Sequence, residues 1–114
     1  MLEYLFGNKN IEKILFFLLK QEKCYAGQLT KKFGTALYGL QTTLQKLEKA
    51  GVLASKMEGH TRFYQFNPRY PFLKELKEFL LKAYQFLPKG IVASLYEENL
   101  RTRPRRQGKP LQLK

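Results

Sequence analysis

Tyr25–Pro68 is the stretch that most constrains the fold of this chain. Apolar residues at helical spacing predict two short helices there, one over Gly27–Phe33 and one from Thr35 or Ala36 to about Ala50. Gly34 separates them, because glycine readily adopts the positive φ with which many helices end. The predicted buried stripe of the second helix consists of Leu40, Leu44 and Leu47.

A compact hairpin is predicted directly after this helix pair. Val52–Met57 and Thr61–Phe66 read as strands, and Gly59 between them can adopt the positive φ of a tight turn. Tyr64 and Phe66 share one face and are expected to pack inward near the hairpin base. A helix–turn–helix followed at once by a basic hairpin can place one helix in a DNA groove and a loop beside it.

The flanking segments complete a mostly α-helical fold prediction. Asn8 is expected to cap a helix that is apolar on several sides, so this helix lies either at the centre of the core or against a partner subunit. A further helix is expected from about Pro71 to Leu87, where Pro88 breaks it, and a short last helix over Ile91–Leu100.

Length and charge favour one domain, residues 1–100, followed by a basic and disordered tail, residues 101–114. The net charge is +12, from 21 Lys and Arg against 9 Asp and Glu, and no acidic residue follows Leu100. The arginines of the tail are Arg101, Arg103, Arg105 and Arg106. A polyanionic partner, with nucleic acid first, is favoured over the alternative that the charge serves solubility alone.

Few other kinds of chemistry are indicated. The apolar run Ile14–Leu19 is far too short to span a bilayer, and the single cysteine, Cys24, suits the reducing cytoplasm. Cys24 is expected to be a small buried residue rather than a redox sensor. One cysteine and one histidine cannot form a tetrahedral metal site, and no nucleophile–base pair or phosphate loop is evident. Neither an enzyme nor a cofactor is expected.

The exposed side of the second helix of the pair carries hydrogen-bonding groups rather than charge. Its candidates for reading DNA bases are Tyr38, Gln41, Thr42 and Gln45. Glutamine can bond bidentately to adenine, threonine can bond a base edge or touch a thymine methyl, and tyrosine can bond phosphate or stack. An ordinary polar helix surface is the alternative, but an exposed Leu37 beside these residues favours a contact surface.

Basic residues flank this face and are candidates for contacts with the DNA backbone, which supply affinity rather than sequence reading. They are Lys31, Lys32, Lys56, His60 and Arg62. Arg62 could also enter a minor groove at the hairpin tip. For any single one of them, a solvated surface charge is the alternative.

Four stretches carry a resemblance to a known family: LFGNKNIEKILFFLL, LTKKFG, LQTTLQKLEKAGVL and EGHTRFYQFNP. With them, the chain from about Leu5 to Leu87 resembles the winged helix–turn–helix regulators of the ArsR and MarR type. The likeness is closest to winged helix domains associated with small nucleotidyltransferases. It implies base-facing positions for the four candidates above and a place in the wing for Arg62. The family usually has Ser or Thr where Ala36 stands and often has Arg or Lys near Thr42.

We expect a homodimer formed by the first long helix and the wide aromatic face of the helix after the hairpin. So small a domain would otherwise expose more apolar surface than a soluble monomer normally does. The expected interface residues are Phe16, Phe72, Leu76, Phe79, Leu80 and Tyr84. The alternative is that the helix after the hairpin simply closes the monomer core.

The predicted function is transcriptional regulation, most simply repression, by a dimer that presents two recognition helices to successive major grooves of double-stranded DNA. Two alternatives stay open, because a fold alone does not decide function. The chain could instead be a protein-interaction module, the antitoxin-like partner of a separately encoded nucleotidyltransferase. RNA binding led by the basic tail is the third hypothesis.

Overall fold

A computed structural model describes residues 2–92 and residue 96 of the chain. They form a mostly helical protein with one small antiparallel sheet of two strands, in agreement with the prediction. The elements in chain order are α1 (Glu3–Phe6), α2 (Lys9–Lys20), α3 (Ala26–Phe33), α4 (Leu37–Lys49), β1 (Leu53–Glu58), β2 (Thr61–Phe66), α5 (Leu73–Gln85) and α6 (Lys89–Ile91). None of the helices in these residues is both long and apolar enough to cross a membrane.

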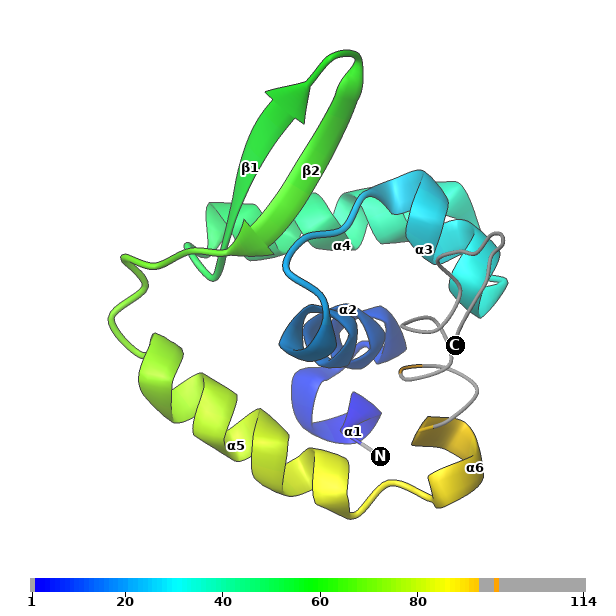
Figure 1. Ribbon diagram of the computed structural model, residues 1–114, viewed down its shortest axis with the longest axis vertical. Coiled ribbons are helices and arrows are strands. Elements are labelled where there is room, and N and C mark those ends of the chain that lie inside the picture. The colour runs from blue at the N-terminus through cyan, green and yellow to red at the C-terminus, as the bar shows by residue number, and fades with distance from the viewer. Residues whose placement is uncertain (1, 93–95, 97–114) are drawn as a thin grey trace, which may run out of the picture.

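Helix α2 lies at the centre of the molecule. Figure 1 shows α3 and α4 on one side of it and α5 on the other. Five successive side chains of α2 are buried: Ile14, Leu15, Phe16, Phe17 and Leu18. A helix that is apolar all round needs neighbours on every side. The sequence left open whether this helix lies in the core or against a partner subunit, and the structure places it in the core.

Three residues that were predicted to form a subunit interface belong to this core instead. Phe16 and Leu80 are completely buried, and Tyr84 is nearly so. The ring centroid of Phe16 lies 5.7 Å from that of Tyr84 and 5.6 Å from that of Tyr96. Little of these side chains is left for a second protein to contact. The prediction was wrong for them because an apolar helical stripe does not show whether its partner lies in the same chain.

Local signals placed several element ends correctly. Asn8 caps α2, since its side-chain oxygen accepts a hydrogen bond from the Asn10 amide at 2.7 Å. Gly34 ends α3 with a φ of 66°. Helix α4 begins slightly later than predicted, because Ala36 at its N-cap has no side-chain acceptor to hold an earlier turn. Helix α1 was not predicted, and a helix of one turn leaves almost no periodic signal.

Two parts of the prediction cannot be followed in the structure. Most of the predicted helix over Ile91–Leu100 lies outside the described residues. So does the predicted tail, residues 101–114, with Arg101, Arg103, Arg105 and Arg106.

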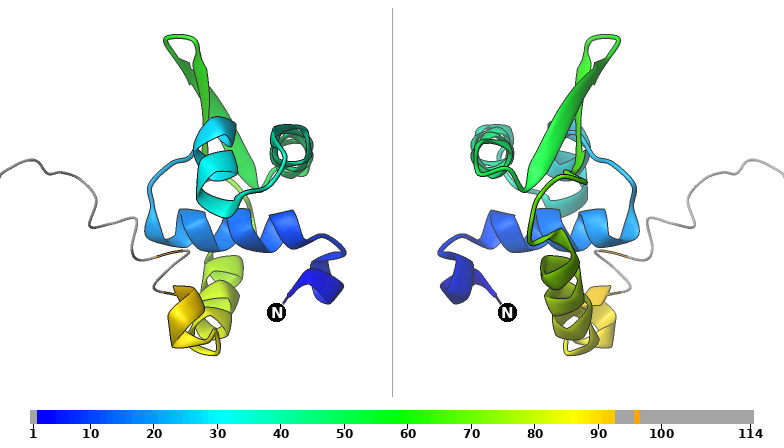
Figure 2. Two further views of the ribbon diagram at one scale, coloured as in Figure 1. Left: turned by 90° about the vertical axis from the view of Figure 1, so that its right-hand side faces the viewer. Right: turned by 90° about the vertical axis from the view of Figure 1, so that its left-hand side faces the viewer.

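The hairpin is fixed to the helices at its base. The backbones of Cys24 and Tyr64 exchange two hydrogen bonds, at 2.9 and 2.7 Å, so the segment before α3 pairs with the outer edge of β2. On the other side, the Asn67 side-chain amide donates to the carbonyl oxygen of Gly51 at 2.9 Å. The far end of the hairpin projects well beyond the helices (Figure 2).

Candidate nucleic-acid interface

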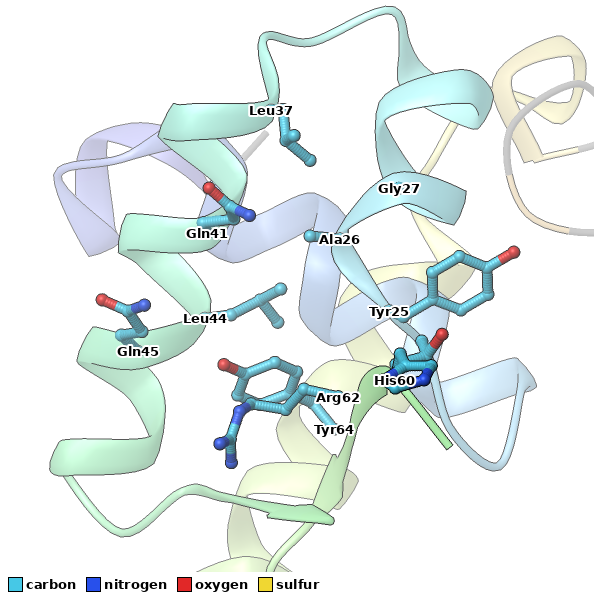
Figure 3. A pocket seen from close by; sticks show the side chains of 11 residues that line it. Tyr25, Ala26, Gly27, Leu37, Gln41, Leu44, Gln45, His60, Arg62 and Tyr64 are labelled. Atoms are coloured by element: carbon cyan, nitrogen blue, oxygen red, sulfur yellow. The ribbon is translucent and has the colours of Figure 1, made fainter. Parts of the chain in front are cut away.

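A hollow of about 390 Å³ lies between α4, the start of α3 and the hairpin (Figure 3). Its apolar side is formed by Leu44 and Tyr64, which are both buried. The polar and charged side chains around it include Tyr25, Gln41, Gln45, His60 and Arg62. Consecutive elements of the chain, α3, α4 and the hairpin, thus combine into one open surface that is rich in hydrogen-bonding groups.

The four residues predicted to read bases fall into two groups on α4. Gln41 and Gln45 line the hollow, whereas Tyr38 and Thr42 are exposed on the adjoining surface. The separation follows from helix geometry, because residues four apart lie on the same side of a helix. Tyr38 is 79% exposed. The Thr42 hydroxyl donates to the carbonyl oxygen of Tyr38 at 2.8 Å, so toward a ligand it presents an acceptor and a methyl group.

The hairpin carries its positive charge on both faces. Lys56 is paired with Phe63, and Arg62 with Met57, and side chains alternate between faces along each strand. Arg62 and Lys56 are therefore on opposite faces. Arg62 lines the hollow beside α4, and Lys56 is exposed on the other side. Of the two basic hairpin strand residues in the prediction, only Arg62 shares a surface with the glutamines of α4.

Two residues that the sequence analysis missed hold Arg62 in place. Arg62 Nη1 donates to Ser55 Oγ at 2.9 Å, and Ser55 Oγ donates to Glu48 Oε2 at 2.6 Å. In Figure 3 the guanidinium group accordingly extends from the hairpin toward α4. Burial and, next, the Glu48 carboxylate raise the pKa of Tyr64, while Arg62 lowers it, so both charges act at the apolar side of the hollow. The contact crosses the turn between α4 and β1, and sequence periodicity does not reveal it.

Tyr25 is a further residue that the sequence analysis missed. It lines the hollow and also borders a second one of about 340 Å³, which is lined by Gln28, Lys31 and Lys32. The Tyr25 ring packs edge-on against Phe63 with 5.2 Å between centroids, which holds it between the two hollows. The predicted lysines of α3 are thus next to the main hollow and not in it. The only signal in the sequence was an aromatic residue directly before a helix, where a small polar cap is usual.

Positive charge dominates the segment that forms α3, α4 and the hairpin. Residues 26–66 contain six Lys and Arg against two Glu, and both glutamates are engaged by other side chains. Glu48 accepts from Ser55, and Glu58 accepts from Lys23 Nζ with both carboxylate oxygens at 2.8 Å. A segment with this excess of positive charge attracts polyanions, and the attraction falls as salt rises.

Cys24 takes no part in this surface. It is completely buried, and burial raises the pKa of its thiol to about 12, so the thiol stays protonated at neutral pH. The prediction of a small buried residue is confirmed. Within residues 2–92 and 96, no three His, Cys, Asp or Glu side chains gather closely enough to hold a metal ion.

Comparison with known proteins yields no match to a family model, to a curated protein or to a solved structure. What the protein does is therefore inferred from its own geometry and charge.

Proposed function

We propose that this protein is a DNA-binding transcriptional regulator with a winged helix–turn–helix fold. In this proposal α4 is the recognition helix in the major groove of duplex DNA, and the hairpin is the wing beside it. The observation that carries the proposal is the hollow between α4 and the hairpin, with glutamines on one wall and a held arginine on the other. Many DNA-binding proteins place one helix in the major groove while a neighbouring element of the protein contacts the DNA beside that groove.

Gln41 and Gln45 are the leading candidates for base contacts. They lie on one side of α4, one turn apart, and both are exposed. A glutamine amide donates and accepts at once, which matches N6 and N7 of adenine. Thr42 offers its methyl group to thymine, and Tyr38 reaches far enough from the helix to contact phosphate or to stack.

Affinity in this proposal comes mainly from charge. Lys31 and Lys32 beside Tyr25, together with Arg62 and His60 on the hairpin, surround the reading residues. Contacts of this kind release counterions from DNA and add affinity for any sequence. The arginines of the tail add to this term.

The outer face of α5 supports a homodimer. Phe72, Phe79 and Phe86 recur every seven residues and are 62, 41 and 69% exposed, and the half-buried Leu76 and Ala83 lie between them. We call these five residues the α5 seam. Alternating spacings of four and three let two helices pack side by side along such a seam. Phe86 was absent from the predicted interface.

A homodimer through the α5 seam gives the protein two copies of α4. The operator then has two half-sites related by two-fold symmetry, separated by one helical turn of DNA or a multiple of it. Repression follows if the bound dimer covers the start of a gene.

The same seam favours a second candidate function. Three exposed phenylalanines, one within α5 and one at each of its ends, could instead bind a different protein, such as the separately encoded nucleotidyltransferase of a toxin–antitoxin-like pair. In that case the seam is the functional surface and the hollow is not.

Binding of the full chain to duplex DNA separates the two candidates. Fluorescence anisotropy would compare the DNA upstream of the protein's own gene with random duplex of equal length, over a salt series. We expect tighter binding to the upstream DNA and a steep fall of affinity with salt. If no duplex binds at low salt, the regulator proposal is wrong and the interaction module is preferred.

A further inference from the structure

We propose that the hollow between α4 and the hairpin receives one sugar–phosphate strand of DNA, and that Ser55 and Glu48 hold Arg62 as the contact for its phosphate. This inference rests on the proposed function. If α4 occupies the major groove and the hairpin reaches the adjacent minor groove, one strand separates the two grooves. That strand has to cross the gap between these two elements, and the hollow is the space that the gap provides.

The lining of the hollow suits a phosphodiester. None of the residues that line it is acidic, and Arg62 and His60 are the basic ones. The buried side chains of Leu44 and Tyr64 offer an apolar surface for a deoxyribose ring. The first residue of α3, Ala26, also borders the hollow, and amide groups at a helix start favour a nearby anion.

The hydrogen bonds behind Arg62 give it a fixed direction. Ser55 and Glu48 do not line the hollow, so they stand behind the guanidinium and do not compete for the space. The bond to Ser55 at 2.9 Å occupies Arg62 Nη1, and the remaining N–H groups of the guanidinium can still bond an anion. Because the side chain is already ordered, less rotamer freedom is lost on binding. Ser55 and Glu48 are thus positioning residues that act through Arg62.

The test uses four variants of the full chain: Arg62→Ala, Ser55→Ala, Ser55→Thr and the double variant Ser55→Ala/Arg62→Ala. Binding to one fixed duplex is measured over a salt series. Arg62→Ala should lower the slope of log affinity against log salt by about one, as expected when one phosphate contact is lost. Ser55→Ala keeps the charge and should weaken binding by roughly three- to tenfold through a less ordered Arg62. Ser55→Thr keeps the hydroxyl and should restore binding.

The double variant distinguishes positioning from a general structural role. If Ser55 acts only through Arg62, the double variant should bind as well as Arg62→Ala alone. Additive losses would overturn the role of Ser55, and an unchanged salt slope in Arg62→Ala would overturn the phosphate contact. Lys74→Ala, which removes an exposed charge from α5, is the matched control and should leave the slope unchanged. Absence of duplex binding by the unaltered protein would reject the proposed function itself, whereas normal binding by Arg62→Ala would reject this inference alone.

Discussion

Gly39 of α4 packs so close to Asn10 of α2 that a Cβ atom added at position 39 would meet Asn10 Nδ2 at 3.4 Å. Position 39 lies on the side of α4 that faces α2, away from the hollow. A glycine inside a helix is normally unfavourable, and here it coincides with a close approach of two helices. The neighbouring atom is the end of a flexible side chain, so it can shift by the few tenths of an ångström that an alanine requires.

Replacing Gly39 with alanine should therefore stabilise the protein. Alanine gains about 1 kcal/mol over glycine inside a helix, and we expect about half of that to remain after Asn10 has moved. Gly34→Ala is the matched control: no atom lies within 4 Å of the added Cβ, but the φ of +66° is strained for alanine and should cost about 1 kcal/mol. Urea denaturation would measure the change in the free energy of unfolding for both variants. Effects of the same sign would contradict this account.

The thiol of Cys24 should make stability depend on alkaline pH. Burial raises its pKa from 9.0 to about 12, so above pH 9 the unfolded chain loses a proton that the folded chain keeps. The contribution of the protonated Cys24 thiol to the free energy of unfolding is therefore complete below pH 9 and is lost as the pH rises toward 12. Relative to Cys24→Ala, the free energy of unfolding of the unaltered protein should fall by about 1.4 kcal/mol per pH unit above 9.

Urea denaturation of both proteins at pH 8 and pH 10 would measure this difference. Other groups that titrate in this range are common to both proteins and cancel. Parallel stability curves would show that the Cys24 thiol is not shielded as its burial implies.

Neighbouring residues of α5 should have separate roles. Phe79→Lys places a charge in the α5 seam and should dissociate the proposed dimer with little change in monomer stability. Leu80→Ala removes a completely buried side chain and should cost about 2–5 kcal/mol of stability. Sedimentation velocity would report the first effect and thermal unfolding the second.

Leu81→Lys is the control for Phe79→Lys. Leu81 is 48% exposed, similar to Phe79 at 41%, but it lies outside the seam. If both lysine variants dissociate the dimer, or if neither does, the seam is not the interface.

Gln41→Ala should reduce sequence preference and leave general DNA binding intact. Loss of a bidentate base contact is expected to cost about 1–3 kcal/mol on upstream DNA and almost nothing on random duplex. Gln65→Ala is a suitable control, because Gln65 is exposed and pairs with Ala54 on the opposite face of the hairpin from Arg62. Equal losses on both DNAs would indicate that Gln41 contacts the backbone and not a base.

Local structure could be predicted well because its causes are local. Asn8 caps α2 through an amide two residues away, and Gly34 ends α3 through its own φ. Leu40, Leu44 and Leu47 are all buried as their spacing predicted. The polar residues of the exposed side of α4 could be named for the same reason, since burial of one side of a helix exposes the other.

The sequence by itself determined the order of the longer helices and the two strands, the buried stripe of α4, and the excess of positive charge. Only the tertiary structure decided which apolar side chains stay exposed to solvent and which polar groups form hydrogen bonds with one another. Phe16 and Phe79 were both predicted to lie in a subunit interface, yet one is fully buried and the other is 41% exposed. Arg62, Ser55 and Glu48 come together across a turn. Periodicity reports the environment of a residue along its own element, whereas these contacts depend on how the elements pack against one another.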